Sequence, residues 1–337
     1  MKAAATVCAT AMTLNQDLTL SIVSVDVVRS PADVLIDVSC AGLCGSDLHA
    51  IHTGDWVGYW PAILGHEVTG YVREVPLSPS PNGRELTPGD QVVVDSRIAC
   101  GVCKGCRTSA RLCERLTWLG ESRAGGFSTL LSVPASLVHL VPRSTEPCIM
   151  VLAEPLAVAI AATRHVSAAS PQQVVIFGYG PIGALCHATL ELLLPTAAVF
   201  VVERNQARAT TAAANGAQIL QPDSALSPDA IIEAAGYPEA LNDAIRLSHR
   251  GTAISLVALA HTASAVLASQ IVEKDLTIRG SNGFDTDDLE MAIQLLAEHP
   301  DRFAPIVTHR LSLEEFSTAL PDDLPPDALK VVVDFTA

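Results

Sequence analysis

The stretch VVIFGYGPIG, residues 174–183, decides the fold of the second half of this chain. Its first four residues are apolar and predict a buried strand, and the G-x-G-x-x-G pattern after them is typical of the turn from such a strand into a helix. Gly178 makes the tight turn, Gly180 lets the backbone approach a pyrophosphate, and Gly183 lets the helix pack closely on the strand. Free N–H groups at the helix N-terminus attract phosphate. We therefore predict a dinucleotide-binding βαβ unit.

Glu203 ends the next predicted strand, twenty residues beyond Gly183. A carboxylate at this place accepts hydrogen bonds from the adenosine ribose, and it repels the 2′-phosphate of NADP. Arg204 and Arg208 lie nearby, and an arginine here can accept that phosphate. The sequence therefore favours NAD and keeps NADP as the less favoured alternative. A glycine turn that binds nothing is the plain structural alternative.

Strand and helix patterns alternate from about residue 148 to residue 284, which is typical of parallel βαβ units. Before them lie short strand-like runs, such as Asp33–Cys40, where apolar residues alternate on one face. After them, the strand-like segments Pro305–His309 and Lys330–Phe335 are expected to rejoin the first part. We therefore predict an α/β chain in which a doubly wound parallel-sheet domain, residues 148–284, is inserted into a β-rich domain, residues 1–147 plus 285–337.

The composition indicates a folded protein that does not bind nucleic acid. Of the 337 residues 49% are hydrophobic and 17% are charged, against about 25% charged on average. The formal net charge of −15 would repel phosphate backbones. The window Gly251–Val272 has no Asp, Glu, Lys or Arg, but its polar residues fit a strand, a loop and a helix better than a membrane span. The N-terminus lacks the Leu-rich centre of a signal peptide, so we predict a first strand there and a cytoplasmic protein.

Four cysteines lie close together in a segment of about residues 97–118. They are Cys100, Cys103, Cys106 and Cys113. Four thiolates at this spacing predict a closed tetrahedral zinc site, which is structural because no coordination position stays open. Unrelated buried thiols and an iron–sulfur cluster are the alternatives.

A second set of metal-ligand residues is dispersed along the chain. Cys44 follows a predicted strand, His66 and Glu67 precede another, and Glu154 lies in a long helix pattern, Cys148–Val166. Each residue taken singly is as easily explained by packing. Together they supply a thiolate, an imidazole and two carboxylates, a mixed set that can leave a coordination position for water or substrate.

Six motifs in this order resemble those of the zinc-dependent medium-chain alcohol/polyol dehydrogenase family, in its sorbitol and threonine dehydrogenase-like branch. They are CGSDLH (44–49), GHEVTG (65–70), the four-cysteine segment, AEP (153–155), GYGPIG (178–183) and EAAG (233–236). The resemblance covers essentially the whole chain. It implies a GroES-like β-rich catalytic domain that holds an inserted Rossmann domain.

The resemblance also implies residue roles. A catalytic zinc would be bound by Cys44 and His66, with Glu67 and Glu154 as the carboxylates and the choice of the direct ligand open. Ser46 and His49 would form the proton relay. The candidate cofactor-binding residues are Gly178, Gly180, Pro181, Ile182, Gly183, Glu203, Arg208, Val257, Ala258, Leu259, Ser281 and Asn282.

The implied activity is hydride transfer between a secondary alcohol and NAD, which gives the ketone, with two zinc ions per chain. Zinc acts as a Lewis acid on the alcohol oxygen, and the nicotinamide takes the hydride. A zinc-independent reductase of quinones or enoyl groups on the same fold and a catalytically inactive NAD-binding protein are the alternatives. The resemblance further implies a small-molecule alcohol or ketone as substrate and a homodimer or homotetramer.

Two departures from the family pattern are present, one in the substrate pocket and one in the four-cysteine segment. The positions that hold a polyol in sorbitol dehydrogenases are Ala50, Gly283 and Phe284 here, so sorbitol is disfavoured, and a secondary alcohol, a cyclitol and an aminocyclitol are the candidates. The aromatic residues at 56, 59 and 60 either line a substrate or pack a loop. In the four-cysteine segment, six residues separate Cys106 from Cys113 where the family usually has seven.

Overall fold

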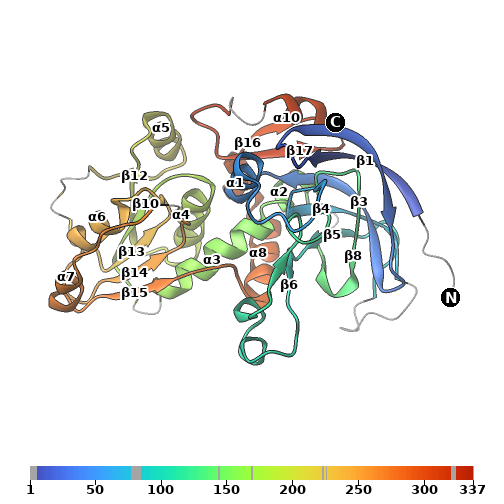
Figure 1. Ribbon diagram of the computed structural model, residues 1–337. Helices are drawn as coiled ribbons and strands as arrows, with labels where there is room; N and C mark the ends of the chain where they lie inside the picture. Colours follow the sequence, from blue (N-terminus) through green and yellow to red (C-terminus); the bar gives the residue numbers. More distant parts are fainter. Residues whose placement is uncertain are drawn as a thin grey trace. The chain divides into compact units, whose positions relative to one another are not determined.

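A computed structural model of the chain divides into two compact units, Met1–Glu154 with Leu289–Leu324 and Lys330–Ala337, and Pro155–Asp288 with Pro325–Leu329 (Figure 1). The structure describes residues 6–76, 85–142, 145–167, 170–221, 224, 226–260, 262–319 and 324–336. Part of the predicted surface loop at 76–89 therefore lies outside the described residues.

The second unit contains a six-stranded sheet in which every neighbouring pair is parallel. Its strands are β10 (Gln173–Phe177), β11 (Ala198–Val202), β12 (Gln218–Ile219), β13 (Ala230–Glu233), β14 (Ala253–Leu256) and β15 (Thr277–Gly280). The spatial order β12-β11-β10-β13-β14-β15 is that of a dinucleotide-binding sheet. The predicted doubly wound domain is confirmed.

Helices follow the strands as the alternating pattern predicts. They are α3 (Ala153–Ser167), α4 (Pro181–Leu193), α5 (Gln206–Ala214), α6 (Ala240–Leu247) and α7 (Ala268–Glu273). In the uncharged window Gly251–Val272, β14 and α7 confirm the predicted strand and helix.

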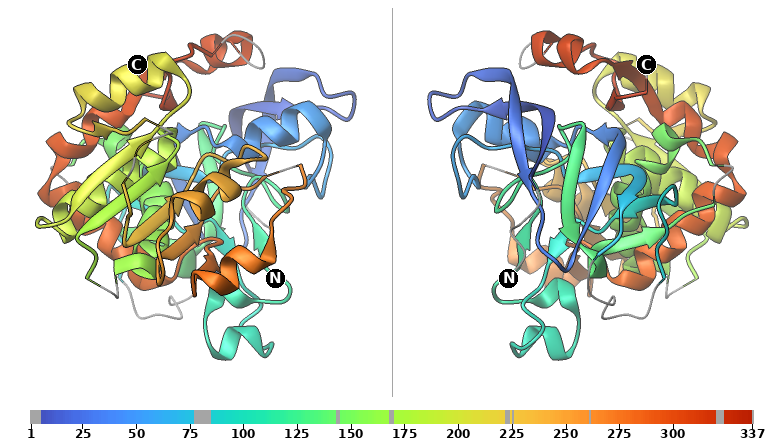
Figure 2. Two further views of the ribbon diagram at one scale, coloured as in Figure 1. Left: turned by 90° about the vertical axis from the view of Figure 1, so that its left-hand side faces the viewer. Right: turned by 90° about the vertical axis from the view of Figure 1, so that its right-hand side faces the viewer.

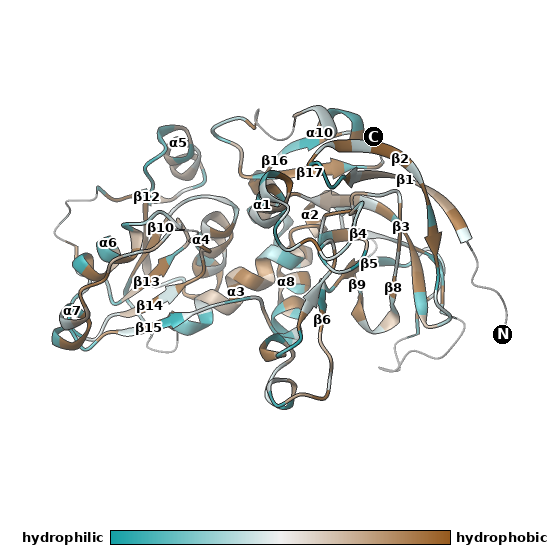
Figure 3. Cartoon of the chain, viewed as in Figure 1, coloured by the Kyte–Doolittle hydropathy of each residue, from teal (hydrophilic) through white to brown (hydrophobic). Residues whose placement is uncertain are grey.

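The single long helix expected at Cys148–Val166 is interrupted. A short helix, α2 (Pro147–Met150), precedes α3, and Val151 and Leu152 lie between them. The 21 residues Pro147–Ser167 are long and apolar enough to cross a membrane, but 83% of their most apolar window is buried inside the protein. This burial is typical of a core helix, and α3 is mostly brown, or apolar, in Figure 3.

The first unit is built on a seven-stranded, mostly antiparallel sheet of order β16-β17-β3-β4-β5-β9, with β8 also paired to β3. These strands are β3 (Asp33–Gly42), β4 (Glu67–Glu74), β5 (Gln91–Val94), β8 (Leu130–Pro134), β9 (Val138–Leu140), β16 (Val307–Leu311) and β17 (Lys330–Asp334). A separate pair consists of β1 (Thr6–Leu14) and β2 (Leu20–Val28). The helices are α1 (Gly45–Thr53), α8 (Thr286–Glu298), α9 (Pro300–Phe303) and α10 (Leu313–Ala319).

The C-terminal segment returns to the first unit, as the sequence predicts. Strand β17 pairs with β3 so that Asp334 lies opposite Cys40, and β16 pairs with β17 in parallel. The strand predicted at Asp33–Cys40 is confirmed as β3, and the structure buries both of its faces. Nine of its ten residues are buried, all but Asp37, because β3 is paired with β4, β8 and β17 and covered on both faces.

The four-cysteine segment forms a lobe that projects from its unit, coloured teal in Figures 1 and 2. Two short antiparallel strands, β6 (Arg97–Ile98) and β7 (Thr117–Trp118), close its base. Because β6 and β7 pair, the lobe begins and ends at the same place in the fold. Its bounds agree with the predicted segment of about residues 97–118.

Candidate metal centre and cofactor site

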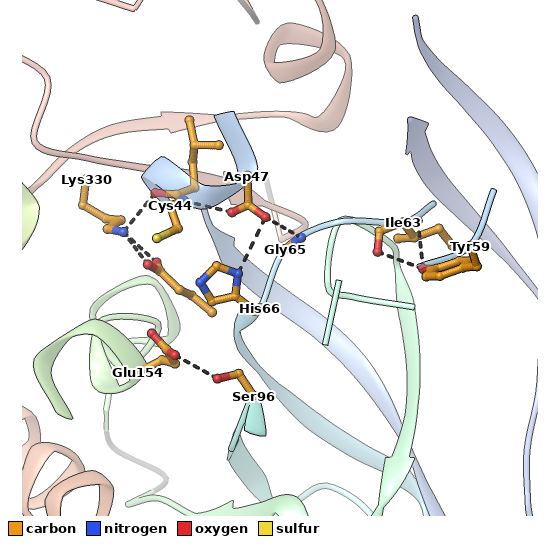
Figure 4. A network of polar contacts seen from close by, with 11 residues as sticks. Cys44, Asp47, Tyr59, Ile63, Gly65, His66, Ser96, Glu154 and Lys330 are labelled. Carbon is orange, nitrogen blue, oxygen red and sulfur yellow. Dashed lines mark hydrogen bonds and ion pairs between the residues drawn. The ribbon is translucent and has the colours of Figure 1, made fainter. Parts of the chain in front are cut away.

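Three of the predicted zinc ligands lie together in the first unit. Cys44 is the N-cap of α1, His66 precedes β4, and Glu67 is the first residue of β4. Their ligand atoms all lie within 4.8 Å of one another. The β3–β4 pairing explains the cluster, because Gly42, opposite Glu67, ends the strand that leads to Cys44. Figure 4 shows the side chains of Cys44 and His66 directed toward each other.

Asp47 holds the two protein segments of this centre in place, a role that sequence reasoning missed. Its carboxylate accepts hydrogen bonds from the backbone N–H groups of Cys44, at 2.9 Å, and Gly65, at 3.1 Å. Its Oδ1 lies 3.6 Å from Nδ1 of His66. The available signal was its place in the CGSDLH motif, in the first turn of α1. A carboxylate behind a ligating imidazole fixes the ring orientation and strengthens the ligand.

Electrostatics around His66 favour its charged form when no cation is present. Burial alone would lower the pKa of His66, but the Asp47 carboxylate and the Cys44 thiolate outweigh burial and raise it well above its usual value. Two negative groups thus surround the imidazole. A divalent cation in the cluster would serve the same electrostatic purpose as a proton.

Glu67 is paired with a buried lysine that sequence reasoning did not find. Lys330 Nζ lies 2.6 Å and 2.8 Å from the two carboxylate oxygens of Glu67, and it also donates to the Leu43 carbonyl at 2.9 Å. Glu67 is fully buried and Lys330 is 1% exposed. The facing Gly42 has no room for a side chain, because a Cβ there would lie 2.0 Å from Glu67 Oε2. The pair is therefore enclosed on all sides by the first unit.

Glu154 lies at the start of α3 and is not part of the three-ligand cluster. Its Oε1 accepts a hydrogen bond of 2.8 Å from Ser96 Oγ (Figure 4). Burial raises the pKa of Glu154 to about 7, against opposing effects of His66 and Ser96 and with a contribution from Glu67. The structure therefore buries both candidate carboxylates. Glu67 is paired with Lys330, and Glu154 is hydrogen-bonded to Ser96.

The expected relay residues lie on α1. Ser46 is half-buried and His49 follows one turn later. His49 Nε2 lies 3.2 Å from Asp55 Oδ2, and the Trp56 ring lies 4.4 Å from the imidazole, centroid to centroid. Asp55 was not singled out from the sequence. The His49 side chain is 19% exposed and that of Asp55 is 65% exposed, so the pair reaches solvent.

The aromatic residues after α1 have separate roles. Trp56 is 44% exposed and stacks on His49. The Tyr59 hydroxyl donates to the Ile63 carbonyl at 3.2 Å and accepts from the Ile63 N–H at 3.0 Å, so Tyr59 packs the loop. Trp60 lies against Gly54. Of these three aromatic residues, Trp56 is the exposed one, and it lies beside a predicted site residue.

The glycine turn of the second unit has the geometry that the sequence predicts. Gly178 has φ +89, a conformation that other residues rarely adopt, and a Cβ on Gly183 would lie 2.1 Å from the Gly178 carbonyl oxygen. A Cβ on Gly180 would meet nothing within 4 Å, so space is open above the start of α4. Glu203 accepts hydrogen bonds from the backbone of Tyr179, at 2.6 Å, and Asn205, at 2.7 Å. The carboxylate thereby connects the ends of β10 and β11.

A cavity of about 180 Å³ opens beside these strand ends. It is lined by Phe177, Val202, Arg204, Leu220, Gln221, Tyr237, Asp243, Arg246 and Leu247. Arg204 lies over the Tyr237 ring at 4.6 Å from its centroid. In open α/β sheets, ligands bind outside the carboxyl ends of the strands, which is where this cavity lies.

Two predicted cofactor residues carry buried polar atoms that have no hydrogen-bond partner in the described part of the chain: Nε of Arg208 and Oγ of Ser281. Ser281 and Asn282 follow β15, and Val257, Ala258 and Leu259 follow β14, the neighbouring parallel strand. Both segments therefore lie at the carboxyl ends of neighbouring parallel strands, on the same side of the sheet. Unsatisfied buried polar groups are rare in proteins, so an absent hydrogen-bonding group is expected at each.

The four lobe cysteines converge as predicted. Their sulfur atoms all lie within 4.8 Å of one another. Backbone N–H groups of Cys106 and Glu114 point at Cys103 Sγ, each at 3.4 Å. Hydrogen bonds from the backbone at Val102 and Cys103 lower the pKa of Cys100 to about 5, which favours its thiolate. N–H groups directed at sulfur stabilise the anionic form that binds zinc.

Two further cysteines, Cys40 and Cys148, form a disulfide that the sequence did not predict. Cys40 lies in β3 and Cys148 in α2, 108 residues later, with Cα atoms 5.4 Å apart. Both are buried in a small core with Val151 and Val332. Disulfides are rare in cytosolic proteins, so the cytoplasmic location remains a prediction.

Comparisons with known proteins cover nearly the whole chain. The family model for the alcohol dehydrogenase GroES-like domain matches residues 30–143, and the model for the glucose dehydrogenase C-terminus matches residues 145–335. The L-threonine 3-dehydrogenase of Bacillus subtilis strain 168 is 29% identical over 305 residues, 84% of this chain and 86% of the relative.

Two solved structures with bound cofactor are similar in fold. A short chain alcohol dehydrogenase from E. coli CFT073, complexed with NADH, has a TM-score of 0.86 and 25% identity over 97% of this chain and 99% of that one. A zinc-binding dehydrogenase from Sinorhizobium meliloti 1021, bound to NADP, has a TM-score of 0.88 and 25% identity over the same shares. The predicted combination of a GroES-like and a Rossmann domain is confirmed.

Proposed function

The chain belongs to the zinc-dependent medium-chain alcohol dehydrogenase family, and we propose that Cys44, His66 and Glu67 form its catalytic metal centre. As a member, it is an oxidoreductase of secondary alcohols that uses a nicotinamide cofactor and zinc. The observation that carries the proposal is the convergence of a thiolate, an imidazole and a carboxylate within 4.8 Å. This mixed set is typical of a zinc site with an open position.

The donor set fits a zinc ion by its chemistry, and zinc there supplies a Lewis acid for the alcohol oxygen. Asp47 positions the His66 ring and leaves its other nitrogen to face the cluster. Lys330 pairs with Glu67 in a buried environment, at 2.6 Å. Glu67 and Glu154 both stay candidate ligands. Glu67 lies in the cluster, and within the described residues the hydrogen bond from Ser96 occupies one of the two carboxylate oxygens of Glu154.

The proton released from the alcohol is proposed to leave along α1. Ser46 would accept it and His49 would pass it on, because an imidazole ring can both accept and donate a proton. The carboxylate of Asp55 orients the imidazole through Nε2, at 3.2 Å, which leaves Nδ1 for the inner side of the relay. Asp55 is exposed, so the proton reaches bulk water from there.

The second unit is proposed to bind the dinucleotide, whose nicotinamide ring accepts the hydride. The open space at Gly180, the unpaired Arg208 Nε and the unpaired Ser281 Oγ support this, since each fits a group of the cofactor. The N-terminus of α4 would bind the pyrophosphate. The nicotinamide would be bordered by the residues that follow the carboxyl ends of β14 and β15, which are Val257, Ala258, Leu259 and Asn282.

We propose NAD as the preferred cofactor. Glu203 ends β11 as a carboxylate held by two backbone N–H groups, and its charge would repel a 2′-phosphate. NADP stays the alternative because Arg204 and Arg208 lie close by in sequence. Arg204 is engaged with the Tyr237 ring, which favours a role in stacking over one in phosphate binding.

The first unit is proposed to be the catalytic domain and the second the NAD-binding domain, as the sequence predicts for 1–147 plus 285–337 and for 148–284. The four lobe cysteines would hold a second, structural zinc. A closed set of four cysteine ligands has no position for substrate, so its contribution is to the fold of the lobe. Two zinc ions per chain are proposed, one at the four lobe cysteines and one at Cys44, His66 and Glu67.

A homodimer is proposed from the edge of the second sheet. Strand β15 pairs with β14 and ends the sheet on that side, and three of its four residues are exposed. Leu267 and Val272 nearby are 62% and 78% exposed. An unpaired edge next to exposed apolar side chains is a template for a second strand. A second copy of this chain would supply the same strand.

Zinc content and turnover together test this function. We expect two zinc ions per chain in freshly purified wild type, and NADH formation with at least one alcohol from a panel of secondary alcohols and cyclitols. Cys44→Ser should lose one zinc and all turnover but keep the fold, whereas Cys103→Ser should lose one zinc and thermal stability. Wild-type turnover in Cys44→Ser would refute the catalytic centre and revive a zinc-independent reductase. Failure of metal-replete protein to bind NADH in a fluorescence titration would support an inactive protein.

A further inference from the structure

The Cys40–Cys148 disulfide lies close in the chain to the proposed zinc ligands. Cys40 is in β3, four residues before Cys44, and Cys148 is in α2, six residues before Glu154. All four residues belong to the first unit. The bond therefore connects the strand that leads to the three-residue cluster with the segment that leads to the other candidate carboxylate.

The two ends of this bond are held differently. Strand β3 is paired with three other strands, β4, β8 and β17. Helix α2 has only four residues, and Arg310 is hydrogen-bonded to both carboxylate oxygens of its N-cap, Glu146, at 2.9 Å each. These two side chains are 45% and 40% exposed, and exposed ion pairs contribute little to stability. Of the two ends, α2 is therefore the one that can move.

A movement of α2 would reach Glu154. The N–H of Val151 donates to the Pro147 carbonyl at 3.1 Å, and that of Leu152 donates to the Ile149 carbonyl at 3.0 Å. These hydrogen bonds continue the turn of α2 up to the start of α3, where Glu154 is the second residue. The segment between the disulfide and Glu154 is thus one hydrogen-bonded turn.

Breaking the bond would enlarge a buried core. The sulfur atoms of a disulfide are about 2.05 Å apart, whereas heavy atoms that are not bonded lie about 3.5–4.0 Å apart. Cys40 and Cys148 are 0% and 1% exposed and pack with Val151 and Val332. Extra length in a packed core is accommodated by shifts of the backbone. Reduction should therefore push α2 away from β3.

The sheet places Glu154 next to the cluster. Strand β5 pairs with β4 so that Val94 lies opposite Val68. Ser96 and His66 each lie two positions beyond this pair, on the same side, so their segments are neighbours. Ser96 Oγ donates to Glu154 at 2.8 Å, and Glu154 is 4% exposed. A shift of α2 would therefore withdraw the Glu154 carboxylate from Ser96 and from the centre.

We propose that Cys40 and Cys148 form a reversible redox modification site that sets how firmly the catalytic centre holds zinc. In the disulfide form, α2 stays against β3 and Glu154 stays at the centre. In the dithiol form, α2 moves away and takes Glu154 with it. In the cytoplasm, where the sequence predicts this protein, disulfides are usually transient and catalytic or redox-sensing. This inference rests on the proposed dehydrogenase function.

The reaction partner would be a dithiol. One of its sulfurs attacks the protein disulfide and forms a mixed disulfide, and its second sulfur then closes the partner's own disulfide. The two protein sulfurs gain two electrons and two protons, and the partner loses them. Asp334 lies opposite Cys40 in β17 and is half-buried, and its carboxylate lies within 4.8 Å of both sulfurs. The partner would approach the bond past Asp334.

The test follows zinc as well as turnover. Zinc-replete wild type with the disulfide formed is treated with a water-soluble phosphine, which takes oxygen from water and reduces the bond to two thiols, as the protein mass confirms. We expect EDTA to remove one zinc about tenfold faster after reduction, the size of effect typical of a disturbed ligand partner, and the lobe zinc at an unchanged rate. Turnover should fall with the faster ion, while Kd for NADH stays unchanged. Oxidised glutathione should restore slow release.

Three variants locate the effect. The double variant Cys40→Ala with Cys148→Ala should not respond to the phosphine. Cys8→Ala, which removes an exposed cysteine of the same unit, is the matched control and should respond as wild type does. Glu154→Gln should release zinc faster from the start and gain nothing from reduction, because the carboxylate is already gone.

The outcomes separate this inference from the proposed function. If the phosphine leaves the bond intact, or if reduction leaves zinc release unchanged, the redox site is wrong. An equal acceleration in the double variant or in Glu154→Gln also overturns it. Uptake of a third zinc by the reduced protein would make Cys40, Cys148 and Asp334 a metal site instead. If wild type oxidises no secondary alcohol but its zinc release responds as expected, the proposed function fails and the redox site stands.

Discussion

Lys330 and Glu67 form an ion pair inside the catalytic unit, with Lys330 Nζ 2.6 Å and 2.8 Å from the two carboxylate oxygens. Both are buried, and the Glu67 carboxylate raises the pKa of Lys330 against the lowering effect of burial. Breaking such a pair from one side leaves a charge buried without a partner.

Replacing Lys330 by methionine should therefore destabilise the first unit strongly. We expect the free energy of unfolding in urea to fall by about 3–5 kcal/mol. The double variant Lys330→Met with Glu67→Gln should recover part of this loss, because no uncompensated charge remains. Lys104→Met, at an exposed position, is the control and should change stability by less than about 0.5 kcal/mol. A Lys330→Met variant as stable as the control would show that the pair is not formed.

Gly105 should be required for the zinc lobe. A Cβ at this position would lie 1.7 Å from the Leu112 carbonyl oxygen, next to Cys113. The shortened spacing between Cys106 and Cys113 leaves no slack to move that carbonyl away. Gly105→Ala should thus reduce zinc to one ion per chain and lower Tm, as elemental analysis and thermal unfolding would show. Lys104→Ala, the exposed neighbour, should keep both ions, and a fully loaded Gly105→Ala would contradict the expectation.

Cofactor preference should depend on Glu203. Its two oxygens each accept a backbone N–H, from Tyr179 and Asn205, so the charge is held at the end of β11. Glu203→Ala should lower kcat/KM for NAD more than for NADP and reduce their ratio by about tenfold, the effect of one charge-assisted interaction. Glu239→Ala, whose carboxylate is 68% exposed, is the control. An unchanged ratio in Glu203→Ala would remove the carboxylate from the specificity site.

Glu233 gives a pH dependence with a defined sign. Burial raises the pKa of Glu233 above 4.5, against the backbone N–H groups of Ala235 and Gly236, which lower it. The folded protein therefore binds this proton more tightly than the unfolded chain. This contribution to stability is full below pH 4.5 and is lost as the pH rises through the folded-state pKa.

Glu233→Gln tests this sign. One oxygen of Glu233 accepts both backbone hydrogen bonds, and the glutamine oxygen can keep them. The variant should gain stability over wild type when the pH is raised from about 4 to about 7, measured as the difference in unfolding free energy across that range. A difference that stays constant with pH would mean that Glu233 is not desolvated.

The edge of β15 should control dimerisation. Thr277 and Ser281 donate their N–H groups to the β14 side, at Thr252 and Leu256, so the N–H of Ile278 points away from β14. Ile278→Pro should remove this outward donor and give monomers in light scattering, whereas Ile278→Ala, which loses the same packing, should stay dimeric. Dimers in both variants would exclude this edge as the interface.

Local sequence patterns are sufficient for much of this fold. The strand and turn at 174–183 and the alternation after them predict the parallel sheet, because each βαβ unit is specified within a short segment. The alternation at β3 predicts the strand but not the burial of its second face, because the strands that pair with it come from distant segments.

The candidate site is predicted less completely. Cys44, His66 and Glu67 belong to recognisable motifs, but Lys330 is 263 residues from Glu67 and reaches it only through the pairing of β17 with β3. Ser96 likewise reaches Glu154, 58 residues later in the chain, only through the tertiary fold. No local pattern marks these residues.

The Cys40–Cys148 disulfide has a topological consequence. It closes a covalent ring of the chain between β3 and α2, and this ring contains Cys44, His66, Glu67 and the whole zinc lobe. A protease that cuts once inside the ring would open it without releasing a fragment. The two pieces would migrate as one chain until a reductant separates them.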